Sequence, residues 1–123
     1  MPYAISIGFL ILCALHAPPA FLAVRPGRMA ALYGVAAMPG GLGVLMHHRA
    51  MLFALVALGC LAAALVPAVR GAVLVLTGWS MTGFLLAYWI GGCPGGAVQR
   101  IAQADLIGMP VLIFLVWAVS RAA

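Results

Sequence analysis

Long apolar runs, separated by short polar connections, dominate the hydrophobic pattern of this chain. The runs cover residues 3–24, 29–46, 50–69, 72–90 and 101–120. Each run approaches the ~20 residues that a helix needs to cross the ~30 Å hydrocarbon layer of a bilayer. An open sheet would leave backbone groups unpaired in lipid, and the alternating pattern of a membrane barrel does not occur here. We therefore predict an all-α, polytopic transmembrane helix bundle of about five spans, with residues 1–123 forming a single transmembrane helical domain.

The last run is the least regular of the five. Gln99, Gln103 and Asp105 interrupt its first part, so that only residues 106–119 are strongly apolar. A stretch of that length is shorter than a full crossing of the bilayer. The expected number of spans is therefore four if the last run does not cross completely.

Proline and glycine interrupt the first two runs. The interruptions are His16-Ala17-Pro18-Pro19 in the first run and Met38-Pro39-Gly40-Gly41 in the second. Proline lacks the amide hydrogen that a helix interior needs. His16 lies nine residues before Arg25 and Pro39 eleven residues after Arg28, so at ~1.5 Å per residue the two interruptions reach a similar depth. The pattern predicts a hairpin of two helices, both broken near the middle of the membrane.

The composition places this chain in lipid rather than in water. Of the 123 residues, 67% are hydrophobic and 6% are charged, whereas soluble domains carry about 25% charged residues. The net charge of +5 comes from arginines that are dispersed between the apolar runs rather than gathered on one basic face. We therefore expect membrane lipid as a partner, no nucleic acid, and no soluble catalytic domain.

The positions of the arginines predict an orientation. With five spans, one side of the membrane receives Arg25, Arg28, Arg70 and Arg121, and the other receives Arg49 and Arg100. Loops on the cytoplasmic side carry an excess of positive residues. We expect an inner-membrane protein whose N-terminus lies outside and whose C-terminus is cytoplasmic, if there are five spans.

Small residues recur at four-residue spacing on two of the predicted helices. They are Gly83, Ala87 and Gly91 on one helix and Gly59 and Ala63 on another. Small side chains let helix backbones approach closely in lipid, where no hydrophobic force drives association. These residues are predicted helix-packing positions, within the chain or against a partner.

His16 is the most informative single residue. Titratable groups inside a membrane are costly, and they usually face the bundle interior or a wet cavity and serve a function. Cys13 lies three residues earlier and shares its helix face, as two ligands of a soft metal would. The alternative is a neutral imidazole that only satisfies a backbone carbonyl freed by Pro18 or Pro19. Both alternatives remain open.

A second cluster of potential ligands is Met46-His47-His48. Thioether and imidazole groups suit a soft ion such as copper(I), so the cluster is a candidate metal site near the membrane surface. The alternative is an ordinary polar connection between two spans. We predict no cofactor, and haem or copper is retained only as an alternative.

Asp105 is the only carboxylate in the sequence. It is expected to cap the last helix or to pair with Arg100, and the alternative is a proton or cation relay. A single acid provides no carboxylate pair for acid and base catalysis, so we expect no enzyme. The candidate polar site comprises His16, Cys13, Pro39, Gly40 and Asp105.

Two functions from different classes fit these patterns. The first is a non-catalytic accessory or assembly subunit of a larger membrane complex, with other membrane subunits as partners. The second is a small oligomeric transporter or channel. Its mid-membrane site would lie where the first two helices are interrupted, near His16 and Pro39, and a soft metal ion is one possible substrate.

Overall fold

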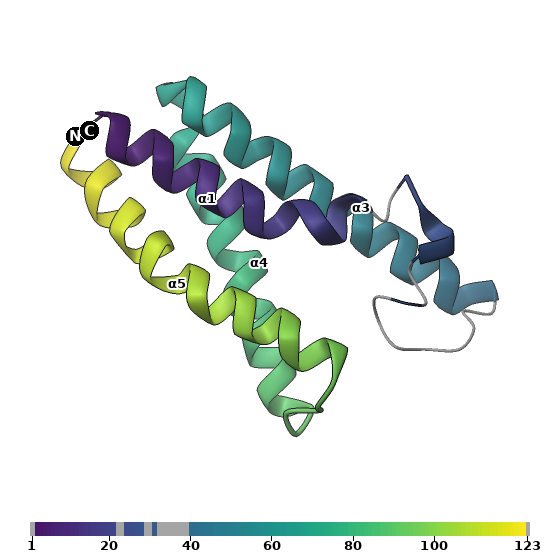
Figure 1. Ribbon diagram of the computed structural model, residues 1–123. Helices are drawn as coiled ribbons and strands as arrows, with labels where there is room; N and C mark the ends of the chain where they lie inside the picture. Colours follow the sequence, from purple (N-terminus) through teal and green to yellow (C-terminus); the bar gives the residue numbers. More distant parts are fainter. Residues whose placement is uncertain (1, 22–23, 29–30, 32–39, 123) are drawn as a thin grey trace.

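Four long helices make up the computed structural model (Figure 1), which describes residues 2–21, 24–28, 31 and 40–122. The helices are α1 (Pro2–Phe21), α3 (Gly40–Leu65), α4 (Arg70–Ile90) and α5 (Ala97–Ala122), joined by the short 3-10 helices η1 (Pro26–Arg28) and η2 (Pro67–Val69). The described part of the chain contains no strand. The predicted all-helical class is confirmed. All four long helices are apolar and long enough to cross a membrane, which indicates an integral membrane protein.

The count of about five spans is not confirmed, because four such helices are found in the described residues. The main difference lies at residues 46–50. The hydrophobic pattern puts a connection there, but α3 continues through it without a break. Residues 44–58 contain no glycine or proline. Two histidines and an arginine interrupt an apolar run, but they do not interrupt a helical backbone.

The last helix also differs from the prediction. Helix α5 extends over 26 residues, so the last run is a long helix rather than a short span. Its buried residues recur every three or four positions, as expected for one face of a helix turned toward a bundle. They are Ala102, Asp105, Gly108, Leu112, Leu115 and Ala118.

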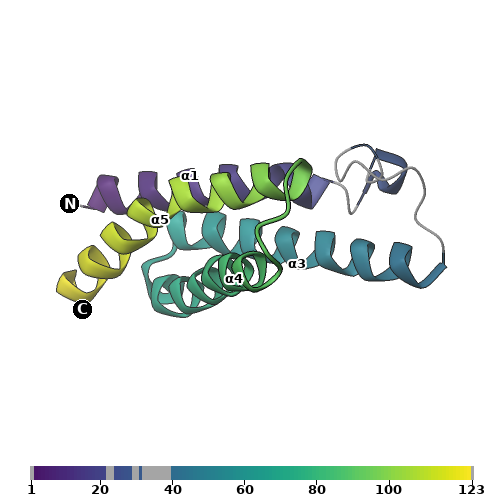
Figure 2. The same cartoon turned by 90° about the horizontal axis from the view of Figure 1, so that it is seen from below.

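The four helices form a closed ring in which each packs against two others. Helix α1 lies beside α3 and α5, and α4 lies beside the same two helices. Neighbouring helices run in opposite directions, so the first turn of α1 and the last turn of α5 lie at the same end of the bundle (Figures 1 and 2). The first turns of α3 extend beyond the ends of α4 and α5 (Figure 2). This is the up-down-up-down topology of a four-helix bundle.

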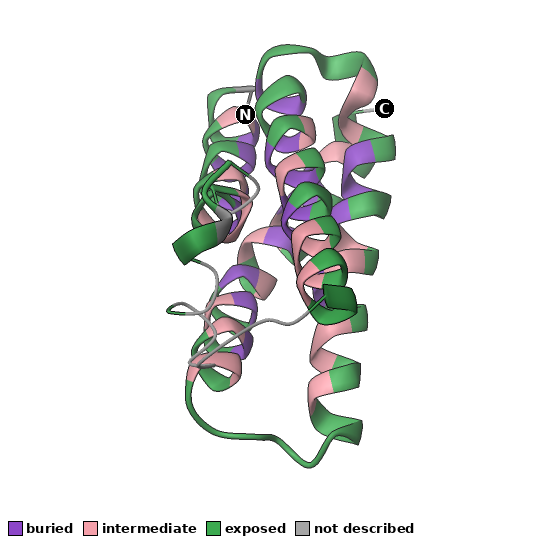
Figure 3. Cartoon of the chain, turned by 90° about the vertical axis from the view of Figure 1, so that its right-hand side faces the viewer, coloured by how far each residue is buried: buried purple, intermediate pink, exposed green. Residues whose placement is uncertain are grey.

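The core lies where the helices face one another (Figure 3). At two glycine positions, side chains of neighbouring helices lie closest to the helix backbone. A Cβ atom on Gly8 would lie 2.8 Å from Leu115 Cδ2, and one on Gly108 would lie 2.8 Å from Met81 Cε and 2.9 Å from Leu15 Cδ1. A larger residue at either position would force these side-chain ends to shift.

The predicted packing residues lie in different surroundings. A Cβ atom on Gly59 would lie 3.6 Å from Val73 on α4, and Ala63 is fully buried. Gly83 faces open space among the described residues, and Ala87 and Gly91 are exposed. Within this chain, Gly59 and Ala63 therefore lie in the contact with α4, whereas the other three lie on its outer surface.

A hydrogen-bonded cluster joins three helices at the end of the bundle that holds the termini. Ser6 Oγ donates to the Ala64 carbonyl oxygen at 2.7 Å. Arg70 Nε donates to the Ala63 carbonyl at 3.0 Å, and its terminal nitrogen donates to Ser6 Oγ at 3.3 Å. These bonds satisfy carbonyls of the last turn of α3, which no intrahelical amide reaches. We call Ser6, Arg70 and these two carbonyls the terminal clamp.

Candidate intramembrane polar site

His16 lies in an unbroken helix. Helix α1 continues to Phe21 with Pro18 and Pro19 inside it, so the predicted break in the first span is wrong. The prolines fall in the last turn, where each removes one i→i−4 hydrogen bond, to the carbonyls of Ala14 and Leu15, and the helix ends two residues after Pro19. His16 is five residues from Phe21, about 7.5 Å along the axis. It therefore lies in the last third of α1 rather than at its middle.

The imidazole of His16 is satisfied on one side only. The residue is 2% exposed, and its Nδ1 donates to the Leu12 carbonyl oxygen at 2.8 Å. Since a carbonyl can only accept, the neutral ring carries its hydrogen on Nδ1 and presents a lone pair at Nε2. Nε2 is buried and has no hydrogen-bond partner among the described residues. The backbone acceptor is thus Leu12, not a carbonyl freed by proline.

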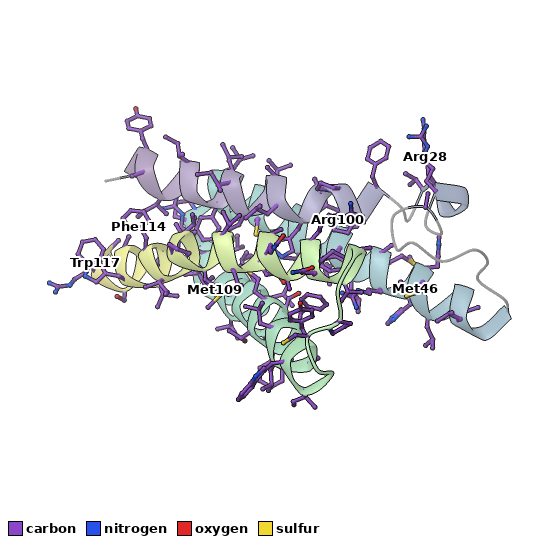
Figure 4. The ribbon with its side chains drawn as sticks, turned by 60° about the horizontal axis from the view of Figure 1, so that its bottom comes forward. Arg28, Met46, Arg100, Met109, Phe114 and Trp117 are labelled. Carbon is purple, nitrogen blue, oxygen red and sulfur yellow. The ribbon has the colours of Figure 1, made fainter. Side chains whose placement is uncertain are left out.

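A cavity of about 390 Å³ lies beside His16, between α1, α3 and α5. We call it the His16 cavity. Its walls are mainly apolar and include Leu15, Pro18, Phe53 and Ile101. The ring of Phe53, from α3, lies 6.0 Å from the imidazole, centroid to centroid. Arg100, near the start of α5 (Figure 4), is exposed and also lines the cavity.

Asp105 faces the same cavity from α5 and is 7% exposed. It does not cap this helix, because α5 begins eight residues earlier, at Ala97. The positive charge that acts on its carboxylate comes from Arg49 on α3, rather than from Arg100. The structure therefore brings His16 and Asp105 together, although they are 89 residues apart in the sequence.

Arg49 was expected at a boundary between two spans but lies within α3. Its guanidinium lies 5.3 Å from the centroid of Phe53 and 4.8 Å from that of Phe84, which is within the range of cation–π attraction. Its Nε is buried without a hydrogen-bond partner in the described part of the chain. With Leu52, Ser80 and Ala87, these three residues line a second cavity of about 270 Å³ between α3 and α4, here called the Arg49 cavity.

Sequence reasoning missed Arg49, Phe53 and Phe84 as site residues. Arg49 and Phe53 are four residues apart and therefore share a helix face. That signal was available, but it requires residues 46–50 to be helical. Phe53 is of particular interest because it lines both the His16 cavity and the Arg49 cavity.

The other residues of the predicted polar site lie elsewhere. Cys13 is half-buried and lines a separate apolar cavity with Ala17 and Leu58. Gly40 is the exposed first residue of α3, with a φ of +33°. Pro39 lies outside the described residues. Of the four predicted members that the structure describes, His16 and Asp105 line the His16 cavity.

Met46, His47 and His48 are consecutive residues of α3. They do not form a connection between two spans, so that alternative is wrong. Met46 and His47 are half-buried and His48 is exposed. Neighbouring positions on a helix point in different directions, so the three side chains do not converge without help from other residues. The described residues contain no group of three or more His, Cys, Asp or Glu that could hold a metal ion. A metal site here stays a prediction.

The fold and the site together define a class: a small four-helix membrane protein with a partly polar cavity inside its bundle. Comparisons with models of protein families, with curated proteins and with solved structures give no significant match. The function is therefore inferred from the geometry of the His16 cavity and from the chemistry of the residues around it.

Proposed function

We propose that this chain is a small membrane transporter or channel whose solute-binding site is the His16 cavity. One observation carries the proposal: His16, whose Nε2 has no partner among the described residues, and Asp105 face the same cavity from different helices. Ionisable residues within membrane helices are costly, and they mark substrate or ion pathways more often than structural contacts.

A purely structural role accounts poorly for this arrangement. An unsatisfied buried acceptor costs about 1–3 kcal/mol, and apolar side chains of similar volume would fill the same space without that cost. The terminal clamp shows that polar residues of this chain can find hydrogen-bond partners within the bundle. A solute that donates to Nε2 accounts for the atom that the described residues leave unpaired.

The dimensions of the His16 cavity fit a small solute. Its volume of about 390 Å³ falls in the lower part of the ~300–1,000 Å³ range of ligand pockets, which are also mostly apolar with a few polar groups. Arg100 lines the cavity and is exposed, so solute can reach the cavity from that end of the bundle.

With four membrane-spanning helices in the described residues instead of five, the orientation expected for the chain in the membrane changes. The end of the bundle where α1 ends and α5 begins carries Arg25, Arg28 and Arg100, with Arg49 inside the first half of α3, and the opposite end carries Arg70 and Arg121. Arg28 and Arg100 are labelled in Figure 4. The positive-inside rule then favours the first end as cytoplasmic. Both termini lie outside in this orientation, which replaces the cytoplasmic C-terminus expected for five spans.

Thermal unfolding of the purified full chain tests this function. The chain in detergent is heated with a panel of small solutes: organic cations, inorganic anions and neutral polar compounds. A ligand that binds only the folded state raises the midpoint temperature. We expect at least one class of solute to stabilise the wild type but not His16→Phe, which keeps a ring against Phe53 and removes both nitrogens. A panel without any such solute would contradict the proposal.

An accessory subunit of a larger membrane complex is the second candidate. The observation that favours it is the exposure of α4, which has the smallest fraction of buried residues among the four candidate spans. Trp79 and Trp89 are 81% and 73% exposed there. The mass of the purified chain in detergent separates the candidates. A discrete homo-oligomer that responds to solute supports transport, whereas a chain that is stable only with a companion protein supports the subunit.

A further inference from the structure

We infer that the solute of the His16 cavity is a small primary amine in its ammonium form. This inference rests on the proposed function and specifies its substrate class. It follows from the hydrogen-bonding character of the groups around the cavity, from the charges that face it, and from its apolar walls.

The inner polar groups of the cavity accept hydrogen bonds rather than donate them. His16 Nε2 presents a lone pair, because Nδ1 carries the ring hydrogen. The carboxylate of Asp105 accepts only. The carbonyl of Leu15 lacks its usual intrahelical donor, since the residue four positions later is Pro19. A ligand that suits these three groups supplies several donors, and an alkylammonium supplies three N–H groups from one atom.

The charges around the cavity come from three helices. Helix α1 contributes His16, which is neutral in the tautomer described. Helix α5 contributes the buried Asp105 and the exposed Arg100. Helix α3 contributes Arg49, whose guanidinium lies against Phe53 and Phe84 and lines the Arg49 cavity, and whose charge also acts on the Asp105 carboxylate. Among the described residues that line the cavity, Asp105 is the buried charged group, and its carboxylate favours a cation.

The apolar walls of the His16 cavity favour some cations over others. Leu15, Pro18, Phe53 and Ile101 offer apolar surface but no donors or acceptors from their side chains. A strongly hydrated inorganic ion would lose water there without replacement. A short alkyl chain buries apolar area against the same surface. A primary amine with a short alkyl group combines this apolar contact with the donors that the inner groups require.

Matched probes test the inference on the wild-type chain, without any substitution. The full chain in detergent at pH 7 is heated with n-butylamine hydrochloride, n-butyltrimethylammonium chloride or sodium chloride at equal ionic strength. The first two share charge and alkyl chain, but only the first has N–H donors. We expect butylamine to raise the midpoint temperature above that in sodium chloride, and the trimethyl compound to leave it unchanged.

Substitutions then locate the site. Asp105→Asn keeps the side-chain volume and removes the charge, so we expect the Kd for butylamine to rise at least about tenfold, as for loss of a hydrogen bond to a charged group. Gln103→Ala is the matched control, since Gln103 is exposed on the same helix two residues away. It should bind butylamine as the wild type does.

Each failure has its own meaning. Equal stabilisation by both organic cations would overturn recognition through N–H donors. Stabilisation by an anion or a neutral compound, dependent on His16 and absent with butylamine, would overturn the amine and leave the proposed function standing. Absence of stabilisation by every solute of the panel would overturn both.

Discussion

At the end of the bundle that holds the termini, Ser6 and Arg70 use their polar groups to tie α1, α3 and α4 together. At the opposite end, His16 leaves Nε2 unpaired in the described structure, and Asp105 faces a cavity rather than a partner. Both sets of residues lie within apolar helices, where burying a polar group costs free energy unless it is hydrogen-bonded. Polar residues in this bundle therefore serve two purposes, since one set ties helices together and the other faces a cavity. Measurements of stability can separate the two.

The largest expected effect comes from a position between the two regions. Gly108→Leu would place a side chain where a single Cβ already lies 2.8 Å from Met81 and 2.9 Å from Leu15. We expect a loss of about 3 kcal/mol in the free energy of unfolding, at the upper part of the range for overpacked cores. Denaturant unfolding in mixed micelles measures it. Gly83→Leu is the control, because Gly83 faces open space in the described structure, and a similar loss there would contradict this packing.

Breaking the terminal clamp should have the next largest effect. Arg70→Leu removes the donors to the Ala63 carbonyl and to Ser6. We expect a loss of about 2 kcal/mol in the free energy of unfolding, because two hydrogen bonds from a charged group disappear. The loss is smaller than the sum of the two bonds, since polar groups of the unfolded chain also find partners in the membrane. Arg121→Leu, at the same end of the bundle, should change it much less. Equal losses in the two variants would show that the clamp does not stabilise the bundle.

A smaller loss is expected for Ser6→Ala. This substitution removes the hydrogen bond from Ser6 to Ala64 but leaves the bond from Arg70 to Ala63 in place. We expect the free energy of unfolding to fall by about 1 kcal/mol, which is the usual net contribution of one hydrogen bond. A double-mutant cycle with Arg70→Leu measures their coupling. Strict additivity would mean that Ser6 and Arg70 act separately.

The smallest effect on stability, with the opposite sign, is expected at His16. His16→Phe removes an unpaired buried acceptor and keeps an aromatic ring beside Phe53. We expect the free energy of unfolding to stay the same or to rise by up to about 1 kcal/mol, while the response to solute disappears. If this variant loses as much stability as Arg70→Leu, the His16 region is a second structural clamp and the contrast between the two ends is lost.

The sequence identified the individual polar residues better than their arrangement. His16 and Asp105 stand out because titratable groups are rare in such apolar runs, and both line the same cavity. Their meeting depends on α1 and α5 packing side by side, which hydrophobicity along the chain does not encode. The all-helical class followed from run length alone.

The errors have a common cause. Polar or proline-containing positions were interpreted as interruptions, whereas α1 continues through Pro18 and α3 continues through Arg49. Helix α1 continues through its prolines at the cost of two hydrogen bonds, and a helix tolerates charge where the side chain finds aromatic faces such as those of Phe53 and Phe84. Such contacts between helices are visible only in three dimensions.

Helices α1 and α5 start and finish the chain at one end of the bundle. Complementary halves of a split fluorescent protein, fused to the two termini through flexible linkers, would then meet in the same compartment and assemble within a single molecule. A chain that crossed the bilayer an odd number of times would hold the halves apart, and cells expressing it would remain dark.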